Sequence, residues 1–105
     1  MKIAVKDKLY DIRYRQDFVK SLSGKQVRRT EASISAVDRS QSGAKQYTSL
    51  YSVVLTQNVK DKDNKYGARK RAIARLIGCV FDKETRKNLW ENVLLKDANI
   101  VGPTT

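Results

Sequence analysis

The sequence predicts an α+β domain in which a small antiparallel β-meander of three to four strands precedes two α-helices packed on one face. Two observations support this fold class. Apolar residues recur at every second position in the first half of the chain and at helical spacing in the second half. Strands that are followed by helices are typical of an antiparallel sheet with helices on one side. At 105 residues we expect one domain, residues 1–105.

The first strand is predicted over residues 10–18. Its apolar and aromatic positions alternate with charged ones: Tyr10, Ile12, Tyr14 and Phe18. This alternation is typical of a half-buried antiparallel strand. Ile3 and Val5 either extend this strand or form a short strand of their own. Residues 21–25 contain serine and glycine, which predicts a turn.

Two further strands are predicted after this turn. Residues 30–36 alternate, with Thr30, Ala32, Ile34 and Ala36 on one face. Residues 38–45 are polar and contain glycine, so we expect a mobile hairpin tip there. Residues 47–59 carry apolar side chains on both faces, which predicts the central strand of the sheet, covered by helix on one side at least in part.

Two helices are predicted over residues 65–78 and 82–96. Asn64 and the aspartates before it are candidate N-caps, and Gly78 is a natural end for the first helix. Its apolar positions fall within one arc: Tyr66, Ile73, Leu76, Ile77 and Val80. The second helix is expected to bury Leu89, Trp90, Val93 and Leu94, with Trp90 as the main anchor. Residues 99–105 are predicted to form a flexible tail.

The composition excludes several classes of enzyme. The chain has no histidine, which excludes Ser-His-Asp and Cys-His nucleophile systems and histidine-ligated metal sites. The single Cys79 allows no internal disulfide and no cysteine-rich zinc site, and we expect it to pack as a small apolar residue. No phosphate-binding glycine motif occurs. We therefore expect no cofactor and no metal.

The chain shows no sign of a membrane segment. No apolar run approaches the roughly 20 residues that a membrane-spanning helix needs. The first residues lack the apolar stretch of a signal peptide. We therefore expect a soluble, cytoplasmic protein.

Positive charge is the most informative property of the sequence. Lys and Arg number 22 against 11 Asp and Glu, which gives a formal net charge of +11. The densest cluster of cations surrounds the first predicted helix: Lys60, Lys62, Lys65, Arg69, Lys70, Arg71 and Arg75. No acidic residue occurs from residue 64 to residue 80, and Asp61 and Asp63 are interpreted as helix-capping charges rather than as ion-pair partners. Uncompensated arginines one turn apart predict an anionic partner.

Further cations are predicted on the sheet and at its hairpin tip: Arg13, Arg15, Arg28, Arg29, Arg39 and Lys45. Tyr10 and Tyr14 interleave with the first of them on the opposite face of the strand. An open sheet face with aromatic residues could stack single-stranded bases. The alternative, that these tyrosines belong to the core, is favoured by their alternation with charged residues.

Catalytic and metal-binding patterns are incomplete. A carboxylate nuclease would use Asp11 or Asp17 with Glu31, but the lysine expected two residues after the glutamate is absent. Residues 61–67 resemble the start of a calcium loop, yet the glycine lies one place late and no glutamate occupies the twelfth place. We therefore predict that the protein is not an enzyme.

Two segments resemble small early-region proteins of bacteriophages and prophages. These are residues 63–76, DNKYGARKRAIARL, and residues 85–90, TRKNLW. In that group a β-meander ends in a G-R/K-x-x-A-L/I-x-R-x-L/I helix and an R-x-x-L/F-W helix, although here Ala68 separates Gly67 from Arg69. The resemblance implies a phage accessory protein, a group rich in DNA-handling factors and in inhibitors of host defence. It implies no catalytic residues.

These observations lead to one leading functional hypothesis and two alternatives. The leading hypothesis is a non-enzymatic, small basic phage-type protein that engages nucleic acid, or a nucleic-acid-binding groove, through its basic helix. The first alternative is an anti-CRISPR-like inhibitor that docks on a host nucleoprotein or nuclease complex in the host cytoplasm. The minor alternative is a small carboxylate nuclease. The sequence also allows a homodimer.

Overall fold

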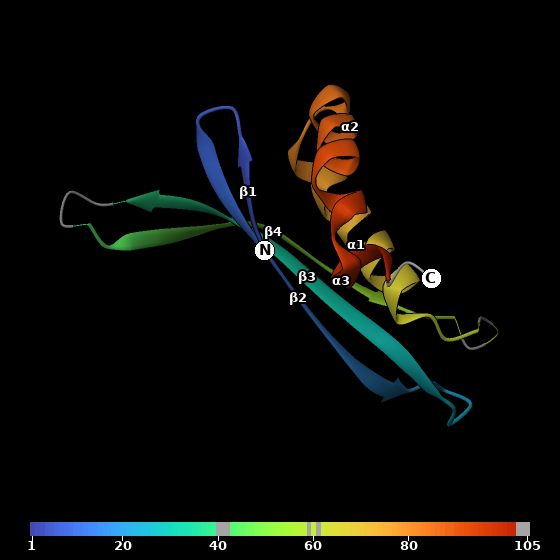
Figure 1. Ribbon diagram of the computed structural model, residues 1–105. Helices are drawn as coiled ribbons and strands as arrows, with labels where there is room; N and C mark the ends of the chain where they lie inside the picture. The colour runs from blue at the N-terminus through green and yellow to red at the C-terminus, as the bar shows by residue number, and fades with distance from the viewer. Residues whose placement is uncertain (40–42, 59, 61, 103–105) are drawn as a thin grey trace.

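The structure is a four-stranded antiparallel sheet with helices on one face (Figure 1). The computed structural model describes residues 1–39, 43–58, 60 and 62–102. The strands lie in sequence order: β1 (Lys2–Val5), β2 (Lys8–Lys20), β3 (Gln26–Arg39) and β4 (Lys45–Thr56). The helices follow them: α1 (Lys65–Val80), α2 (Lys83–Asn92), the 3-10 turn η1 (Leu94–Lys96) and α3 (Ala98–Val101). The predicted α+β meander is confirmed, and Ile3 and Val5 lie in a strand of their own.

Strand register places one set of side chains under the helices. Ile12 of β2 is paired with Ile34 of β3, and Ile34 is paired with Tyr51 of β4. Side chains in register point to the same face of a sheet, so these positions share the helix-covered face. The β3–β4 register shifts after Ile34, because Ser35 pairs with Ser49 and Leu50 is the additional residue of a β-bulge.

The prediction that the third long strand is central is wrong. β4 lies at one edge of the sheet, and β2 and β3 are the central strands. Val53 is buried against α1, whereas Val54 is 58% exposed on the opposite face. An edge strand with exposed apolar side chains has the same two-sided apolar pattern as a buried central strand. Val59, at the predicted end of this strand, lies outside the described residues.

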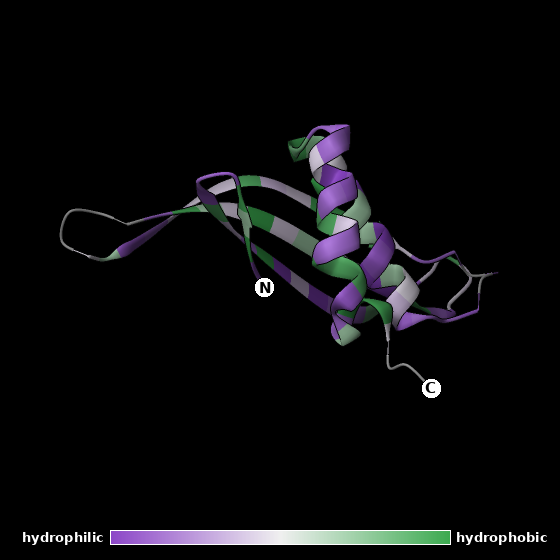
Figure 2. Ribbon diagram, turned by 45° about the horizontal axis from the view of Figure 1, so that its top comes forward, coloured by the Kyte–Doolittle hydropathy of each residue, from purple (hydrophilic) through white to green (hydrophobic). Residues whose placement is uncertain are grey.

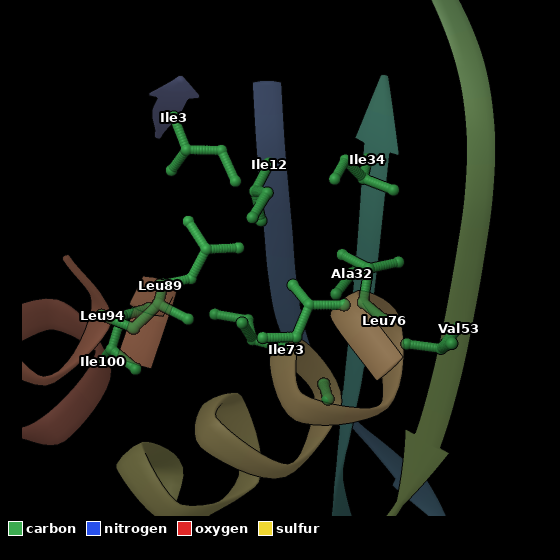
Figure 3. Packing of buried hydrophobic residues seen from close by; sticks show 12 residues of the cluster. Ile3, Ile12, Ala32, Ile34, Val53, Ile73, Leu76, Leu89, Leu94 and Ile100 are labelled. Carbon is green, nitrogen blue, oxygen red and sulfur yellow. The ribbon is translucent and has the colours of Figure 1, made fainter. Parts of the chain in front are cut away.

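The core lies between the sheet and α1, with the later helices closing one side (Figure 3). Ile12, Ile34 and Val53 from the sheet meet Ile73 and Leu76 from α1. Ile77, Leu89 and Leu94 are also buried, as the sequence predicts. Two small residues that the periodicity missed, Ala68 and Ala72, are buried as well and allow α1 to approach the strands closely.

The helix ends differ from the predicted ones by a few residues. The Asn64 side chain caps α1 by accepting a hydrogen bond of 3.0 Å from the Gly67 N–H, and α1 continues past Gly78 to Val80. The Asp82 side chain caps α2, which ends at Asn92 rather than at residue 96. Ile100, expected in a flexible tail, lies in α3 and is fully buried. Residues 103–105 lie outside the described residues.

Two predicted core residues lie elsewhere. Leu89, not Trp90, is the buried anchor of α2, and Trp90 is half-buried at the margin of the core. Consecutive helix residues differ by about 100° in direction, so only one of the two can point straight at the sheet. Cys79 is exposed, not packed as a small apolar residue. It lies on the flank of α1 that faces β4, where its thiol interacts with the Tyr51 side chain.

The β3–β4 hairpin extends away from the helices as an arm (Figure 1). Every side chain from residue 43 to residue 50 is exposed, and the molecule measures 52 × 30 × 24 Å along its principal axes. Figure 2 shows that the outward sides of α1 and α2 are largely hydrophilic. Among the described helices, none is long and apolar enough to cross a membrane.

Candidate nucleic-acid interface

The structure divides the predicted cations into arginines that pair with acidic or polar groups of the fold and exposed cations with no carboxylate partner among the described residues. Arginines of the first group form hydrogen bonds with acidic or polar groups of the fold: Arg13, Arg15, Arg28, Arg29 and Arg69. Those of the second group surround the start and the outer side of α1: Lys60, Lys62, Lys65, Lys70, Arg71 and Arg75. The side chain of Arg39 lies outside the described residues.

The arginines on the open face of the sheet are paired with carboxylates. Arg15 donates to Glu31 at 2.9 Å, and Arg29 forms two hydrogen bonds with Asp17. The Arg29 guanidinium lowers the pKa of Asp17. Arg13 likewise donates to Asp11 at 2.7 Å. The charges of the open face are therefore paired, in two ion pairs between β2 and β3 and in the Arg13–Asp11 pair within β2.

Arg28 connects the sheet to the segment that enters α1. Its guanidinium donates two hydrogen bonds, of 2.8 and 3.0 Å, to the Asp63 carboxylate, and it stacks 4.6 Å from the centre of the Phe18 ring. These hydrogen bonds lower the pKa of Asp63. The interpretation of Asp63 as a capping charge is therefore wrong, because Asn64 caps the helix and Asp63 pairs with arginine. The pair borders a cleft of about 420 Å³ that Lys62 also lines.

Arg69 is a structural residue on the sheet side of α1. Its Nε donates to Gln16 Oε1 at 2.7 Å, and its Nη1 donates to the carbonyl of Asn99 at 2.9 Å. The guanidinium also lies 5.0 Å from the centre of the Tyr14 ring and 5.5 Å from that of Tyr66. Arg69 therefore joins β2, α1 and α3, and its Nε and Nη1 donors are used within the fold.

The predicted stacking platform is absent from the positions proposed for it. Tyr10 and Tyr14 are half-buried on the helix-covered face. The Tyr10 ring packs edge-on against Phe81 at 5.1 Å between centroids, and Arg69 covers Tyr14. Both tyrosines belong to the margin of the core, as their alternation with charged residues favours.

The exposed cations of α1 point to two different flanks. The Lys70 ammonium lies 6.0 Å from the centre of the Trp90 ring, on the α2 side. Arg75 lies on the β4 side, where its charge acts to lower the pKa of Tyr51. A hydrogen bond with Cys79 has the larger effect and raises the pKa of Tyr51. The exposed cations of α1 thus lie on different flanks, with Lys70 toward α2 and Arg75 toward β4, and Arg71 lies one turn before Arg75.

Arg71 and Arg75 differ from the sheet arginines Arg13, Arg15, Arg28 and Arg29 in having no carboxylate partner among the described residues. Both are exposed, one turn apart. Lys60, Lys62 and Lys65 are exposed in the segment that leads into the same helix. The name cationic row is used below for these residues: Lys60, Lys62, Lys65, Arg71 and Arg75.

The carboxylates considered for nuclease chemistry are held by arginines. Asp11 pairs with Arg13, and Asp17 and Glu31 pair with Arg29 and Arg15. In the described part of the chain, no three potential metal ligands gather at one place. Asp17 and Glu31 thus serve in ion pairs that hold neighbouring strands.

No family model, no curated protein and no solved structure matches the chain. The resemblance to phage early-region proteins stays a prediction. The fold and the site define a small basic α+β protein. Its distinguishing feature is the cationic row, which is exposed along and before α1 and of which Arg75 lies beside the edge strand β4.

Proposed function

We propose that the protein binds nucleic acid through the cationic row. The observation that carries this proposal is the contrast between its arginines. Arg13, Arg15, Arg28 and Arg29 each have a carboxylate within hydrogen-bond distance, whereas Arg71 and Arg75 have none among the described residues. Like charges one turn apart destabilise a helix by a few tenths of a kcal/mol, so this placement does not serve folding.

The chemistry of the row fits phosphate. Guanidinium groups bind phosphate oxygens through two parallel N–H donors, and lysines add mobile point charges. Contacts of this kind position a nucleic acid but do not read its bases. We therefore expect little sequence preference. The net charge of +11 would also speed encounter with a polyanion.

Salt dependence provides the first test. Neutralising about five phosphates gives a slope of roughly −4 to −5 for log K against log salt on duplex DNA. We expect binding of a labelled duplex at low salt that weakens steeply between roughly 50 and 200 mM salt. A slope near zero, or no binding at the low end of this range, would contradict the proposal.

Charge reversal with a matched control provides the second test. Arg71→Glu combined with Arg75→Glu is expected to abolish binding while the melting temperature changes little, because both side chains are exposed. The control is Lys83→Glu combined with Lys87→Glu, which reverses two exposed cations at the same spacing on α2. Equal losses in the two double variants would mean that total charge, rather than the cationic row, determines binding.

A further inference from the structure

The two edges of the sheet are built differently. On one side, the short β1 covers the first part of β2, and the rest of the β2 edge carries Arg13, Arg15, Asp17 and Lys20. On the other side, β4 runs from Lys45 to Thr56 with no charged residue after Lys45. Natural proteins commonly protect exposed edges with charged residues, proline or short strands. Apart from Lys45 at its start and the β-bulge at Leu50, the β4 edge has no such protection, and its last six residues carry neither a charge nor a proline.

The β4 edge is also apolar and open. Tyr47, Leu50, Tyr51 and Val54 of this strand are each between 43% and 58% exposed. Within the described residues the sheet ends at β4. α1 packs on one face of β3 and β4. The strand therefore presents both backbone groups and apolar side chains to solvent.

The free backbone groups can be assigned by alternation along the strand. The Gln57 N–H donates to the carbonyl of Arg28 at 2.9 Å, so Gln57 faces β3. In an antiparallel pair, every second residue makes such bonds. Leu55, Val53 and Tyr51 therefore face β3 with their backbone groups. The N–H and C=O groups of Ser52, Val54 and Thr56 point away from the sheet.

We propose that the β4 edge is a docking site for an extended acidic segment of a partner protein, which adds to the sheet as a fifth strand. Its main-chain groups would pair with those of Ser52, Val54 and Thr56. Its side chains on the helix-covered face would lie beside Arg75, which already acts on Tyr51. Those on the open face would lie beside Val54. The segment that fits therefore alternates acidic and apolar residues.

Charge selects this occupant over a second copy of the chain. Two β4 strands paired antiparallel would form one continuous sheet, with both α1 helices on the same face. The arginine rows of the two copies would then face each other across the joint, and each chain already carries a net charge of +11. An acidic strand removes this repulsion and satisfies the same backbone groups.

The test uses a labelled peptide of about eight residues that alternates valine and glutamate, and a second peptide with lysine in place of glutamate. We expect the acidic peptide to bind the full chain and the lysine peptide not to bind, by fluorescence anisotropy. Hydrogen exchange of the unmodified protein should show new protection at Ser52, Val54 and Thr56. Binding of both peptides alike, or binding without this protection, would overturn the proposal.

A pair of variants isolates the backbone contribution. Val54→Pro removes an outward N–H that β3 does not use, and Val54→Thr keeps it while changing the same side chain. Val54→Pro is expected to weaken peptide binding roughly tenfold, whereas Val54→Thr should bind nearly as the natural chain does. Equal affinities in both variants would argue against strand addition. If Val54→Pro does not fold, the hydrogen-exchange measurement on the unmodified protein replaces this comparison. Protection of Ser52, Val54 and Thr56 by the acidic peptide would then support strand addition, and its absence would overturn it.

Two further measurements separate the alternatives. Sedimentation of the free protein that shows a dimer, with Ser52, Val54 and Thr56 already protected, would replace the acidic segment with a second copy and overturn the proposal. Nucleic-acid binding by Val54→Pro should equal that of the natural chain, because the cationic row is unchanged. The two sites share Arg75 but not the outward backbone groups of β4, so a parallel loss of both activities would contradict strand addition at this edge.

Discussion

Arg28 and Asp63, which lie 35 residues apart in the chain, form two hydrogen bonds that connect β3 to the segment entering α1. The Arg28 side chain is only 14% exposed, whereas that of Asp63 is 53% exposed. The pair holds the start of the basic helix at one end of the sheet. It therefore sets where the lysines of the cationic row lie relative to Arg71 and Arg75.

Removing the Arg28–Asp63 pair is expected to make the stability of the fold depend less on pH in the acidic range. Because Arg28 lowers the pKa of Asp63 in the folded chain, the stabilisation is fully present above the ordinary Asp range near pH ~4 and is lost as pH falls through the lowered folded pKa. Asp63→Asn should melt below the natural chain at neutral pH, and the difference should shrink in acid. Melting curves from neutral to acidic pH measure this, with Asp38→Asn as an exposed control. A difference that is independent of pH would contradict the assignment.

Replacing Arg69 is expected to destabilise the fold. Arg69→Met removes the hydrogen bonds to Gln16 and to the Asn99 carbonyl, which should cost about 2 kcal/mol in the free energy of unfolding. The adjacent Lys70→Met changes an exposed side chain and should stay within about 0.5 kcal/mol. Urea denaturation of both variants gives the comparison. If Arg69→Met and Lys70→Met are equally stable, the hydrogen bonds of Arg69 contribute nothing to stability, and Arg69 remains a candidate for partner binding.

Leu89 is expected to contribute more to stability than Trp90. Leu89→Ala leaves a cavity in the core, and such changes cost about 2–5 kcal/mol. Trp90→Ala removes a larger side chain that is only half-buried, so its effect should be smaller. Chemical denaturation of the two variants under identical conditions tests the order. The reverse order would restore Trp90 as the anchor of α2.

The cap of α1 should be measurable on its own. Asn64→Ala removes the acceptor for the Gly67 N–H and should cost about 1 kcal/mol, whereas Asn64→Ser retains a side-chain oxygen and should cost less. Thermal melting of the two variants tests this difference. If alanine and serine are equivalent, the capping bond contributes nothing to the stability of the helix.

Local patterns predicted most of the elements, because each depends on residues that are close in the chain. Alternation around Ile12 and Ile34 and helical spacing around Ile73 and Leu76 indicate which side chains are buried. The same helical spacing could also have placed Arg69. It precedes Ile73 by four residues and Leu76 by seven, so it lies on the same side of the helix as these two core residues. An arginine within an apolar arc indicates a cation that is bound inside the fold.

Contacts between residues that are far apart in the chain could not be predicted from local sequence patterns. Nothing near Asp63 indicates that Arg28 is its partner, and the ion pairs across β2 and β3 follow from a register that the pattern leaves undetermined. The edge position of β4 depends on which strands pair, and apolar residues such as Val54 on its outer face are compatible with either position. The exposed cations of α1 were predicted, but their division between two flanks required the positions of Tyr51 and Trp90.

The arm formed by the ends of β3 and β4 has a consequence for how the chain can vary. Side chains from residue 43 to residue 50 are all exposed, so replacing them changes little of what the core buries. Folding therefore constrains the identity of these residues only weakly, through turn and strand preferences. Gly43 has a φ of 83°, so the backbone itself favours glycine there. Any position in residues 44–50 that stayed invariant across descendants of this chain would record selection by something that the arm touches, separately from selection for a stable fold.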